Sequence, residues 1–262
     1  MSTTEQDQVV ITPLILTYNE SPNIARVLDQ LSGYHKIVVI DSYSKDNTVE
    51  IINSYQNTVC YQRDFDNHTD QWNFGLSKVE TEWVLSLDAD YVITDELQQE
   101  MLDAIMNPGY PGYYIPFKYL VFGKALGASI LPPRLALFKR SSATYVQDGH
   151  TQMLKLDGDS GHLEHPIWHD DRKPLDRWLW AQTRYAELEV EKLTSKAKSE
   201  LSFNDKIRKR IVLAPFLVFI YCLVLKRGLF DGWRGWFYAF QRTYAELLLS
   251  LKLIERKFLE KN

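Results

Sequence analysis

One short stretch, Val84–Asp90, restricts the fold of this chain more than any other, because a mostly apolar run ends in two carboxylates. Its first four residues, Val84-Leu85-Ser86-Leu87, predict a strand buried on both faces, as the strands of parallel sheets are. Ligands of open α/β sheets bind beyond the carboxyl ends of the strands, where Asp88 and Asp90 would lie. Two such carboxylates suit a hard divalent cation such as Mg²⁺, and a solvated Asp-x-Asp turn is the alternative that the tripeptide alone leaves open.

Three strand-and-helix units precede this strand. Apolar segments predict strands over 9–17, 36–40, 59–62 and 84–88. Helices are predicted to begin at Ser21 and Asp46, and a third runs through Leu76. This alternation predicts an α/β fold with a Rossmann-like, mainly parallel sheet, flanking helices and right-handed crossovers. Further along, 112–119 and 135–138 are predicted strands, and 175–193 is a predicted long helix.

The predicted strand ends carry polar residues suited to a nucleotide. Thr17-Tyr18-Asn19-Glu20 follows the first strand, and Asp41 ends the second, so their loops should lie side by side. A carboxylate at the position of Asp41 can accept hydrogen bonds from a ribose or a base N–H. The chain contains neither the glycine-rich dinucleotide fingerprint nor the phosphate-binding Gly-x-x-x-x-Gly-Lys-Ser/Thr motif.

These motifs, together with Gln71-Trp72-Asn73-Phe74, give the chain its resemblance to a known family. Over residues 9–175 it resembles the family 2 glycosyltransferases, which have the GT-A fold, and it looks closest to lipopolysaccharide core β-1,4-glucosyltransferases. The resemblance implies a nucleotide-diphospho-sugar donor, with a UDP-sugar favoured. It also implies a Mg²⁺ or Mn²⁺ ion and inversion at the anomeric carbon.

The resemblance also implies roles for individual residues. Asp41 would hold the nucleoside, Asp88 would lie near its ribose, and Asp90 and the late His169 would bind the metal. The expected donor-binding residues are Thr17, Tyr18, Asn19, Glu20, Asp41, Asn73, Asp88 and Arg134. Surface solvation is the alternative for Arg134, and a hydrogen-bonded structural role is the alternative for His169.

An inverting transferase needs a base that removes the proton of the acceptor hydroxyl. Family members carry an acid in the stretch that corresponds to 145–150, and Asp148 is the candidate here. The related branch has a His-Glu pair at this place, whereas this chain has His150-Thr151. An Asp before Gly is also an ordinary turn residue, so a turn at Asp148-Gly149 is the alternative.

Charge divides the chain into two parts. Residues 206–262 contain twelve Lys/Arg and four Asp/Glu, whereas residues 1–205 contain eighteen and thirty. We therefore expect a catalytic domain over 1–200 and a helical, membrane-associated tail over 201–262. The apolar run Ile211–Leu225 is short for a membrane span and has basic residues on both sides, which favours an in-plane or re-entrant segment on the inner leaflet over a crossing. A buried core helix is the alternative.

The remaining expectations concern location and partners. Residues 1–8 are polar and lack the features of a signal peptide, which favours a cytoplasmic protein, peripheral on the inner face of the membrane. The tail aromatics cluster with aliphatic residues, so a nucleic-acid partner is not expected. The predicted function is transfer of a sugar to a lipid-linked or lipopolysaccharide-core glycan. A haloacid-dehalogenase-type phosphatase, from the Asp-x-Asp-x-Val pattern, and a non-catalytic sugar-nucleotide-binding scaffold are the alternatives.

Overall fold

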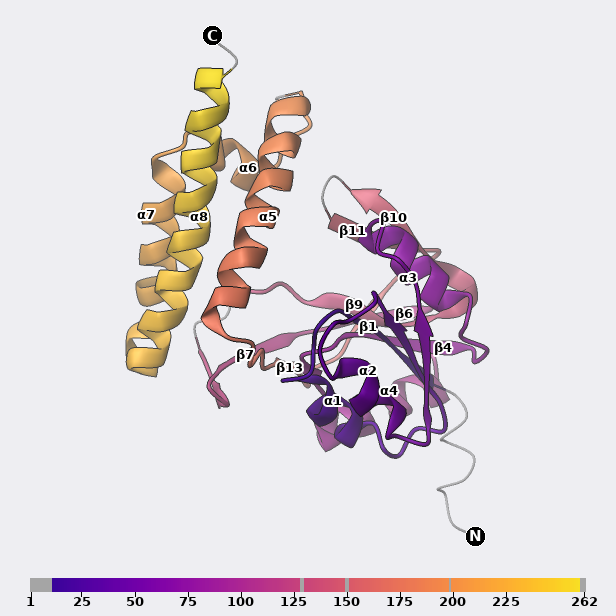
Figure 1. Ribbon diagram of the computed structural model, residues 1–262. Helices are drawn as coiled ribbons and strands as arrows, with labels where there is room; N and C mark the ends of the chain where they lie inside the picture. The colour runs from indigo at the N-terminus through magenta and orange to yellow at the C-terminus, as the bar shows by residue number, and fades with distance from the viewer. Residues whose placement is uncertain (1–10, 128–129, 149–150, 198, 260–262) are drawn as a thin grey trace. The chain divides into compact units, whose positions relative to one another are not determined.

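The computed structural model describes residues 11–127, 130–148, 151–197 and 199–259 (Figure 1). The chain forms two compact units. The first contains the residues up to Gly123 together with Leu131–Arg172, and the second contains Lys124–Ile130 and the residues from Lys173 onward.

The first unit is built on a seven-stranded sheet of order β12-β6-β9-β4-β1-β2-β3. Four strands are parallel: β1 (Ile11–Thr17), β2 (Ile37–Asp41), β3 (Thr58–Gln62) and β4 (Trp83–Asp88). Next to β4 lies β9 (Arg134–Lys139), antiparallel to it, followed by β6 (Gly112–Ile115) and β12 (Gly161–His162). The expected α/β fold with a mainly parallel sheet is therefore confirmed.

Helices cover both faces of this sheet, as the apolar strands require. On one face, α1 (Ile24–Gln30), α2 (Thr48–Asn53) and α4 (Asp95–Met106) pack in one core cluster with Ile15. On the other face, α3 (His68–Leu76) packs in a second cluster with Leu14 and with the hairpin of β10 (Ala143–Asp148) and β11 (Thr151–Leu156) (Figure 1). Adjacent residues of β1 thus belong to different cores, because successive side chains of a strand point to opposite faces.

A small second sheet stands beside the end of β4. It contains β5 (Tyr91–Val92), β13 (Ile167–His169) and β7 (Phe117–Val121), in that order. The predicted strand over 112–119 is divided at Pro116 between β6 and β7, since proline donates no hydrogen bond to a ladder. The two-residue strand β8 (Lys124–Ala125) belongs to the second unit.

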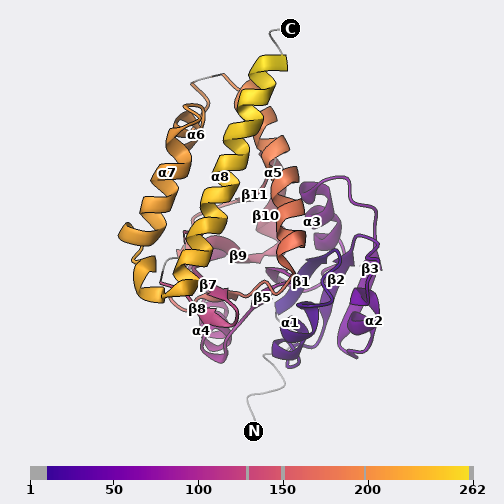
Figure 2. The same ribbon diagram turned by 60° about the vertical axis from the view of Figure 1, so that its left-hand side comes forward.

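The second unit is helical. It contains α5 (Leu175–Ser195), α6 (Phe203–Arg208), α7 (Leu213–Ile220) with a π-helical turn over Tyr221–Leu225, a 3-10 turn over Gly228–Asp231, and α8 (Trp233–Leu259). Figures 1 and 2 show α7 beside α8. Sequence analysis placed the domain boundary at residue 200, but α5 packs with the C-terminal helices. Leu193 of α5 shares an apolar cluster with Leu249 and Leu253 of α8, so this helix belongs with the tail.

Buried charges reinforce that packing. Arg208 of α6 bonds Glu246 of α8 at 2.6 Å and Glu189 of α5 at 3.3 Å. The pKa of Arg208 is raised, because hydrogen bonds and attraction from these carboxylates outweigh the lowering effect of burial. Removing one partner would leave a buried charge uncompensated, so the cluster ties the three helices together.

The apolar run Ile211–Leu225 is neither a span nor a fully buried helix. Ala214, Pro215, Cys222 and Leu223 are buried, whereas Phe216 and Val224 are exposed. Within the described part of the chain, no helix combines the length and the apolar character that a membrane crossing needs.

Candidate active site

The polar ends of the parallel strands lie in register at one edge of the sheet. Asp41 of β2 stands opposite Thr17 of β1 on one side and Gln62 of β3 on the other, and Asp88 of β4 stands opposite Leu16. Since neighbouring strands are about 4.8 Å apart, Asp41 and Asp88 lie two strand spacings from each other, about 10 Å. This edge therefore has two acidic strand ends about 10 Å apart, one carboxylate buried and the other 42% exposed.

Asp41 is the most heavily bonded carboxylate of this edge. It is fully buried, and its Oδ1 accepts hydrogen bonds from the hydroxyls of Thr17 (3.1 Å) and Ser44 (2.5 Å). Its Oδ2 accepts from the backbone N–H of Ser44 (2.9 Å) and from Nε2 of Gln62 (3.3 Å). Four donors from three strand ends converge on this one side chain, so it fixes the loops around it. Direct contact with a nucleoside stays a prediction.

The loop after β1 is joined to the loop after β2. Asn19 has a φ of 54° and donates its backbone N–H to Ser44 Oγ (2.8 Å), while its own side-chain oxygen accepts from the Lys45 backbone (2.7 Å). The backbone N–H of Glu20 donates to Thr48 Oγ1 (2.7 Å). Tyr18 is 40% exposed beside these bonds. Backbone and side-chain bonds thus hold the loop of Thr17–Glu20 in place.

Asp88 is paired with the predicted Arg134. Nη1 of Arg134 donates to Oδ2 of Asp88 at 3.0 Å, and its guanidinium lies over the rings of Trp72 and Tyr91, 5.2 and 5.7 Å from their centroids. The pKa of Arg134 is raised, since attraction by Asp88 and neighbouring groups outweighs the lowering effect of burial. The positive charge of Arg134 is therefore permanent. Arg134 holds Asp88, whose side chain is 42% exposed, at the carboxyl end of β4.

The second acid of the motif meets the late histidine. Nε2 of His169 lies 3.3 Å from Oδ2 of Asp90, because β13 pairs antiparallel with β5 directly after the motif. The imidazole packs edge-on against the rings of Tyr91 and Tyr119, with centroids 5.2 and 4.8 Å away. Burial alone would lower the pKa of His169. The nearby Asp90 and other carboxylates raise the pKa by more than burial lowers it, so the net shift is upward. The structure thus brings together the two residues predicted to bind metal.

This pair fits a divalent ion that is bound mainly through a nucleotide. Among the described residues there is no group of three or more His, Cys, Asp or Glu side chains placed to hold a metal. Mg²⁺ at phosphate-binding sites is usually held by one or two carboxylates together with substrate phosphates and water. Asp90, with His169 beside it, supplies a set of that size, and Nδ1 of His169 is buried without a hydrogen-bond partner in the described part of the chain.

Asn73 has a different position from the one expected. Its side-chain amide donates to the carbonyl of Tyr145 (2.9 Å) and accepts from the N–H of the same residue (3.1 Å). Its neighbour Trp72 stacks on the Tyr145 ring, with centroids 5.3 Å apart. Both residues therefore hold β10, the strand that ends at Asp148, against α3. The side chain of Asp148 lies outside the described residues.

Sequence reasoning missed Ser44 and Gln62, which complete the bonds to Asp41. Ser44 stands three residues after an Asp that ends a strand, which is a spacing typical of side-chain-to-backbone turns. Gln62 ends the next parallel strand, so the register would place it beside Asp41. Both signals were present in the sequence, but they depend on strand order, which it does not state.

The chain is similar in sequence to known glycosyltransferases and in fold to solved structures. The model of the family described as "Glycosyl transferase family 2" matches residues 13–144. An uncharacterized glycosyltransferase of Rickettsia prowazekii is 33% identical over 92 residues, which are 35% of this chain and 31% of that protein. The glycosyltransferase SunS of Bacillus subtilis is 31% identical over 101 residues, 35% of this chain and 22% of that protein. The chain thus covers about a third or less of the length of these curated relatives.

Solved structures share the fold at low identity. The crystal structure of S. aureus TarS 1-349 in complex with UDP-GlcNAc is 15% identical, with a TM-score of 0.53 over 97% of this chain and 92% of that chain. The crystal structure of S. aureus TarS 1-349 gives 14% identity and a TM-score of 0.50 over the same shares. This similarity supports the GT-A-like fold.

The bonds of Asp41 lead to a stability prediction. In the Asp41→Asn variant, an amide NH₂ replaces one acceptor oxygen and faces donors that point at it, which leaves them buried without a partner. We expect the free energy of unfolding to fall by about 2 kcal/mol or more. Chemical denaturation measures the change, and Asp64→Asn at an exposed position is the matched control. Equal stability of the two variants would contradict the central role of Asp41.

Proposed function

Because the chain belongs to glycosyltransferase family 2, we propose that it transfers a sugar from a nucleotide-diphospho-sugar to an acceptor hydroxyl. The observation that carries this proposal is the edge where Asp41, Asp88 and Asp90 follow two parallel strands beside His169. A UDP-sugar is the donor we favour, since TarS, which shares the fold, was crystallised with UDP-GlcNAc.

In this proposal the nucleoside lies across the ends of β1 and β2. Tyr18 would stack on the base, the loop fixed by Asp41 would contact it, and the half-exposed Asp88 would accept from the ribose. Arg134 donates to Asp88 and orients its carboxylate, and it is therefore a positioning residue. Glu20 and Asn19 hold the loop in shape through their backbone bonds.

Asp90 and His169 would hold Mg²⁺ or Mn²⁺ against the diphosphate. Such an ion neutralises the charge that develops on a leaving diphosphate. His169 must release its proton to act as a ligand, and its raised pKa indicates that the proton competes for this site. The two tyrosine rings around His169 limit its movement, so the nitrogen that faces Asp90 remains aimed at it.

We propose an inverting displacement with Asp148 as the base. The acceptor oxygen attacks the anomeric carbon from the side opposite the diphosphate, the bond to the diphosphate breaks, and Asp148 takes the hydroxyl proton. The support is the position of Asp148 at the end of β10, which Asn73 and Trp72 hold against the catalytic unit.

The acceptor that we propose is a glycan on a lipid, such as a lipid-linked or lipopolysaccharide-core glycan, at the inner face of the membrane. The second unit exposes large apolar side chains, among them Phe216, Leu225, Phe230, Trp233 and Phe240. Basic residues adjoin them at Lys209, Arg210, Lys226 and Arg227, and the region from 206 onward carries eight more positive than negative charges, from twelve against four. An apolar surface with basic neighbours suits an anionic bilayer.

The two alternatives are less well supported. In haloacid-dehalogenase-type phosphatases, the Asp-x-Asp motif ends the first strand, whereas here three strands precede β4 and the family match covers all four. A non-catalytic scaffold would not need Asp90 and His169 placed at 3.3 Å. Hydrolysis of p-nitrophenyl phosphate would favour the first alternative, and nucleotide-sugar binding without turnover would favour the second.

The metal proposal predicts the behaviour of Asp90. The neutral amide of Asp90→Asn is a poor ligand for a hard cation, so transfer should fall to background. UDP release from UDP-glucose, UDP-galactose and UDP-GlcNAc in Mn²⁺ measures it, and the Mn²⁺-dependent rise in melting temperature with UDP should disappear. The exposed Asp159→Asn is the control. Full activity of the native chain in EDTA would contradict the metal role.

The base proposal predicts a separation of chemistry from binding. Asp148→Asn keeps the shape of the side chain but cannot take a proton, so kcat should fall by about 10²–10⁴ while the Kd for the donor stays the same. Steady-state kinetics and calorimetric titration with the donor measure the two effects. Asp157→Asn, exposed just after β11, controls for loss of charge near the hairpin. If donor affinity falls instead, Asp148 belongs to the donor site.

The membrane proposal predicts that charge and apolar burial act together. Each Lys or Arg near an anionic surface contributes about 1 kcal/mol, so Lys209→Glu with Arg210→Glu should release the protein from anionic vesicles at moderate salt. Phe216→Ser with Phe230→Ser should weaken binding at every salt concentration. Vesicle flotation measures both, and Met106→Ser, exposed in the first unit, is the control. A native chain that never floats would contradict the membrane acceptor.

A further inference from the structure

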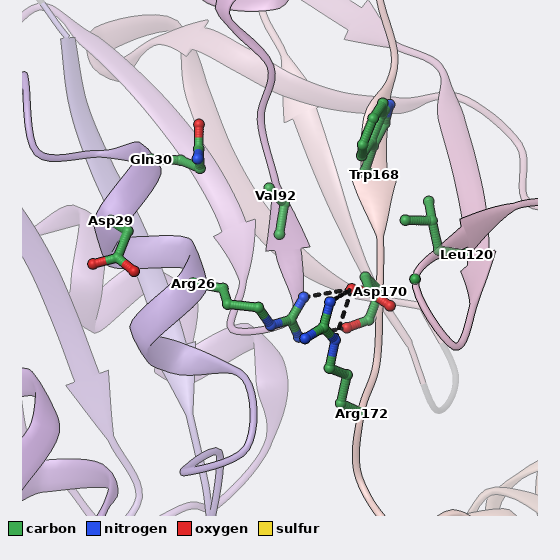
Figure 3. A pocket seen from close by; sticks show the side chains of 9 residues that line it. Arg26, Asp29, Gln30, Val92, Leu120, Trp168, Asp170 and Arg172 are labelled. Atoms are coloured by element: carbon green, nitrogen blue, oxygen red, sulfur yellow. Dashed lines mark hydrogen bonds and ion pairs between the residues drawn. The ribbon is translucent and has the colours of Figure 1, made fainter.

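A pocket of about 240 Å³ lies in the first unit, away from the edge where Asp41 and Asp88 stand. Figure 3 shows it between α1, β5, β7 and the segment that follows β13. Its lining includes Arg26, Asp29 and Gln30 from α1 and Trp168, Asp170 and Arg172 from the region of β13. None of the functions proposed above uses this pocket.

The pocket lies on the opposite face of the small sheet from His169. His169 stands opposite Tyr91 on one side and Tyr119 on the other, and these three side chains are in contact. The residue adjacent to each of these three along its own strand lines the pocket. They are Val92 after Tyr91, Trp168 before His169 and Leu120 after Tyr119. Since successive side chains of a strand point to opposite faces, the proposed metal ligand and the pocket share β13 but not a face.

The polar centre of the pocket is Asp170, which is 3% exposed. Its Oδ2 accepts from Nη1 of Arg26 (2.5 Å) and from Nε of Arg172 (3.0 Å), and its carbonyl accepts from Nη2 of Arg26 (2.8 Å). Its Oδ1 and the Nε of Arg26 are buried without a hydrogen-bond partner among the residues that the structure describes. A buried polar atom without a partner costs free energy, so this centre has bonding capacity left for a ligand.

The chemistry of the lining selects the class of ligand. Two arginines and two aspartates give a formal charge of zero, which does not favour an anion over a neutral molecule. The indole of Trp168 is 39% exposed and offers an apolar face, while Gln30, Asp29 and Arg172 contribute exposed donors and acceptors elsewhere in the lining. A molecule with one apolar face and a rim of hydroxyls matches this arrangement, and a pyranose sugar has that form.

We propose that this pocket binds a neutral sugar unit, separate from the donor sugar. The proposal rests on the proposed function for its biological meaning: the unit would belong to the acceptor glycan, at a distance from the hydroxyl that reacts. Asp170 links the two places, since its backbone N–H donates to the carbonyl of Asp90 at 3.1 Å. Asn23 extends the link, accepting from the N–H of Arg172 (2.9 Å) and donating to Glu20 of the donor-side loop (2.9 Å).

The test is direct binding of sugars to the full chain, without donor or metal. Saturation-transfer NMR would use glucose, galactose and N-acetylglucosamine, and their disaccharides cellobiose, lactose and diacetylchitobiose, each at millimolar concentration. At least one should receive saturation from the protein. Trp168→Ala should weaken that binding about tenfold, and Trp168→Phe should restore part of it, because a ring remains.

Two further variants separate the pocket from general effects of folding. Gln30→Trp adds a ring at an exposed lining position and should block the sugar while leaving the melting temperature unchanged. Trp180→Ala removes a half-exposed indole in the second unit and should leave sugar binding as in the native chain.

Three results would overturn the proposal. They are the absence of binding by all six sugars, binding unaffected by both Trp168→Ala and Gln30→Trp, and displacement of the sugar by inorganic phosphate at lower concentration, which would assign the pocket to an anion. Because donor and metal are omitted, each of these results leaves sugar transfer untouched. Conversely, a chain that binds these sugars but releases no UDP from any donor contradicts the proposed function alone.

Discussion

The hydrogen bonding of the Asp41 carboxylate is the interaction on which the candidate site depends. A buried carboxylate is unfavourable unless donors surround it, and here the donors come from Thr17, Ser44 and Gln62, at the ends of three parallel strands and their loops. The register of the sheet brings these groups together before any ligand is present. The loops that would receive a nucleotide therefore have a defined shape in the free protein, which lowers the entropy cost of binding.

The small sheet divides a second set of tasks between its two faces. One face carries His169 between two tyrosines and directs it to Asp90, while the other carries Trp168 toward the Arg26–Asp170–Arg172 cluster. Alternation along β13 makes this possible within three residues. The backbone N–H of Asp170 also donates to the carbonyl of Asp90, so one backbone bond joins the segment after β13 to the residue that precedes β5.

The sequence predicted the succession of strands and helices along the chain and the positions of Asp41, Asp88 and Asp90 at strand ends, because apolar runs and polar breaks are local signals. It also predicted that His169 would lie with Asp90, although only through resemblance to a family. It did not predict that Asn73 bonds the backbone of Tyr145 or that Arg134 pairs with Asp88, since both depend on side-chain contacts between distant segments. The sequence did not predict that the second unit begins at Lys173 for the same reason. The apolar side of α5 does not reveal that α8 is the helix it packs against.

The second unit has a surface that its own fold does not require. A helix that served only as core would bury its large apolar side chains. Instead, α7 and the following turns bury small side chains such as Ala214 and Cys222, and they expose the large side chains of Phe216, Leu225 and Phe230. Exposed apolar area of this kind is unfavourable in water, and contiguous patches usually mark an interaction site. Pro215 lies in the first turn of α7, and a π-helical turn continues the helix over Tyr221–Leu225, so the run forms a short apolar helix below spanning length. The basic residues at both ends of this region are the further feature on which our proposal of an anionic bilayer as its partner rests.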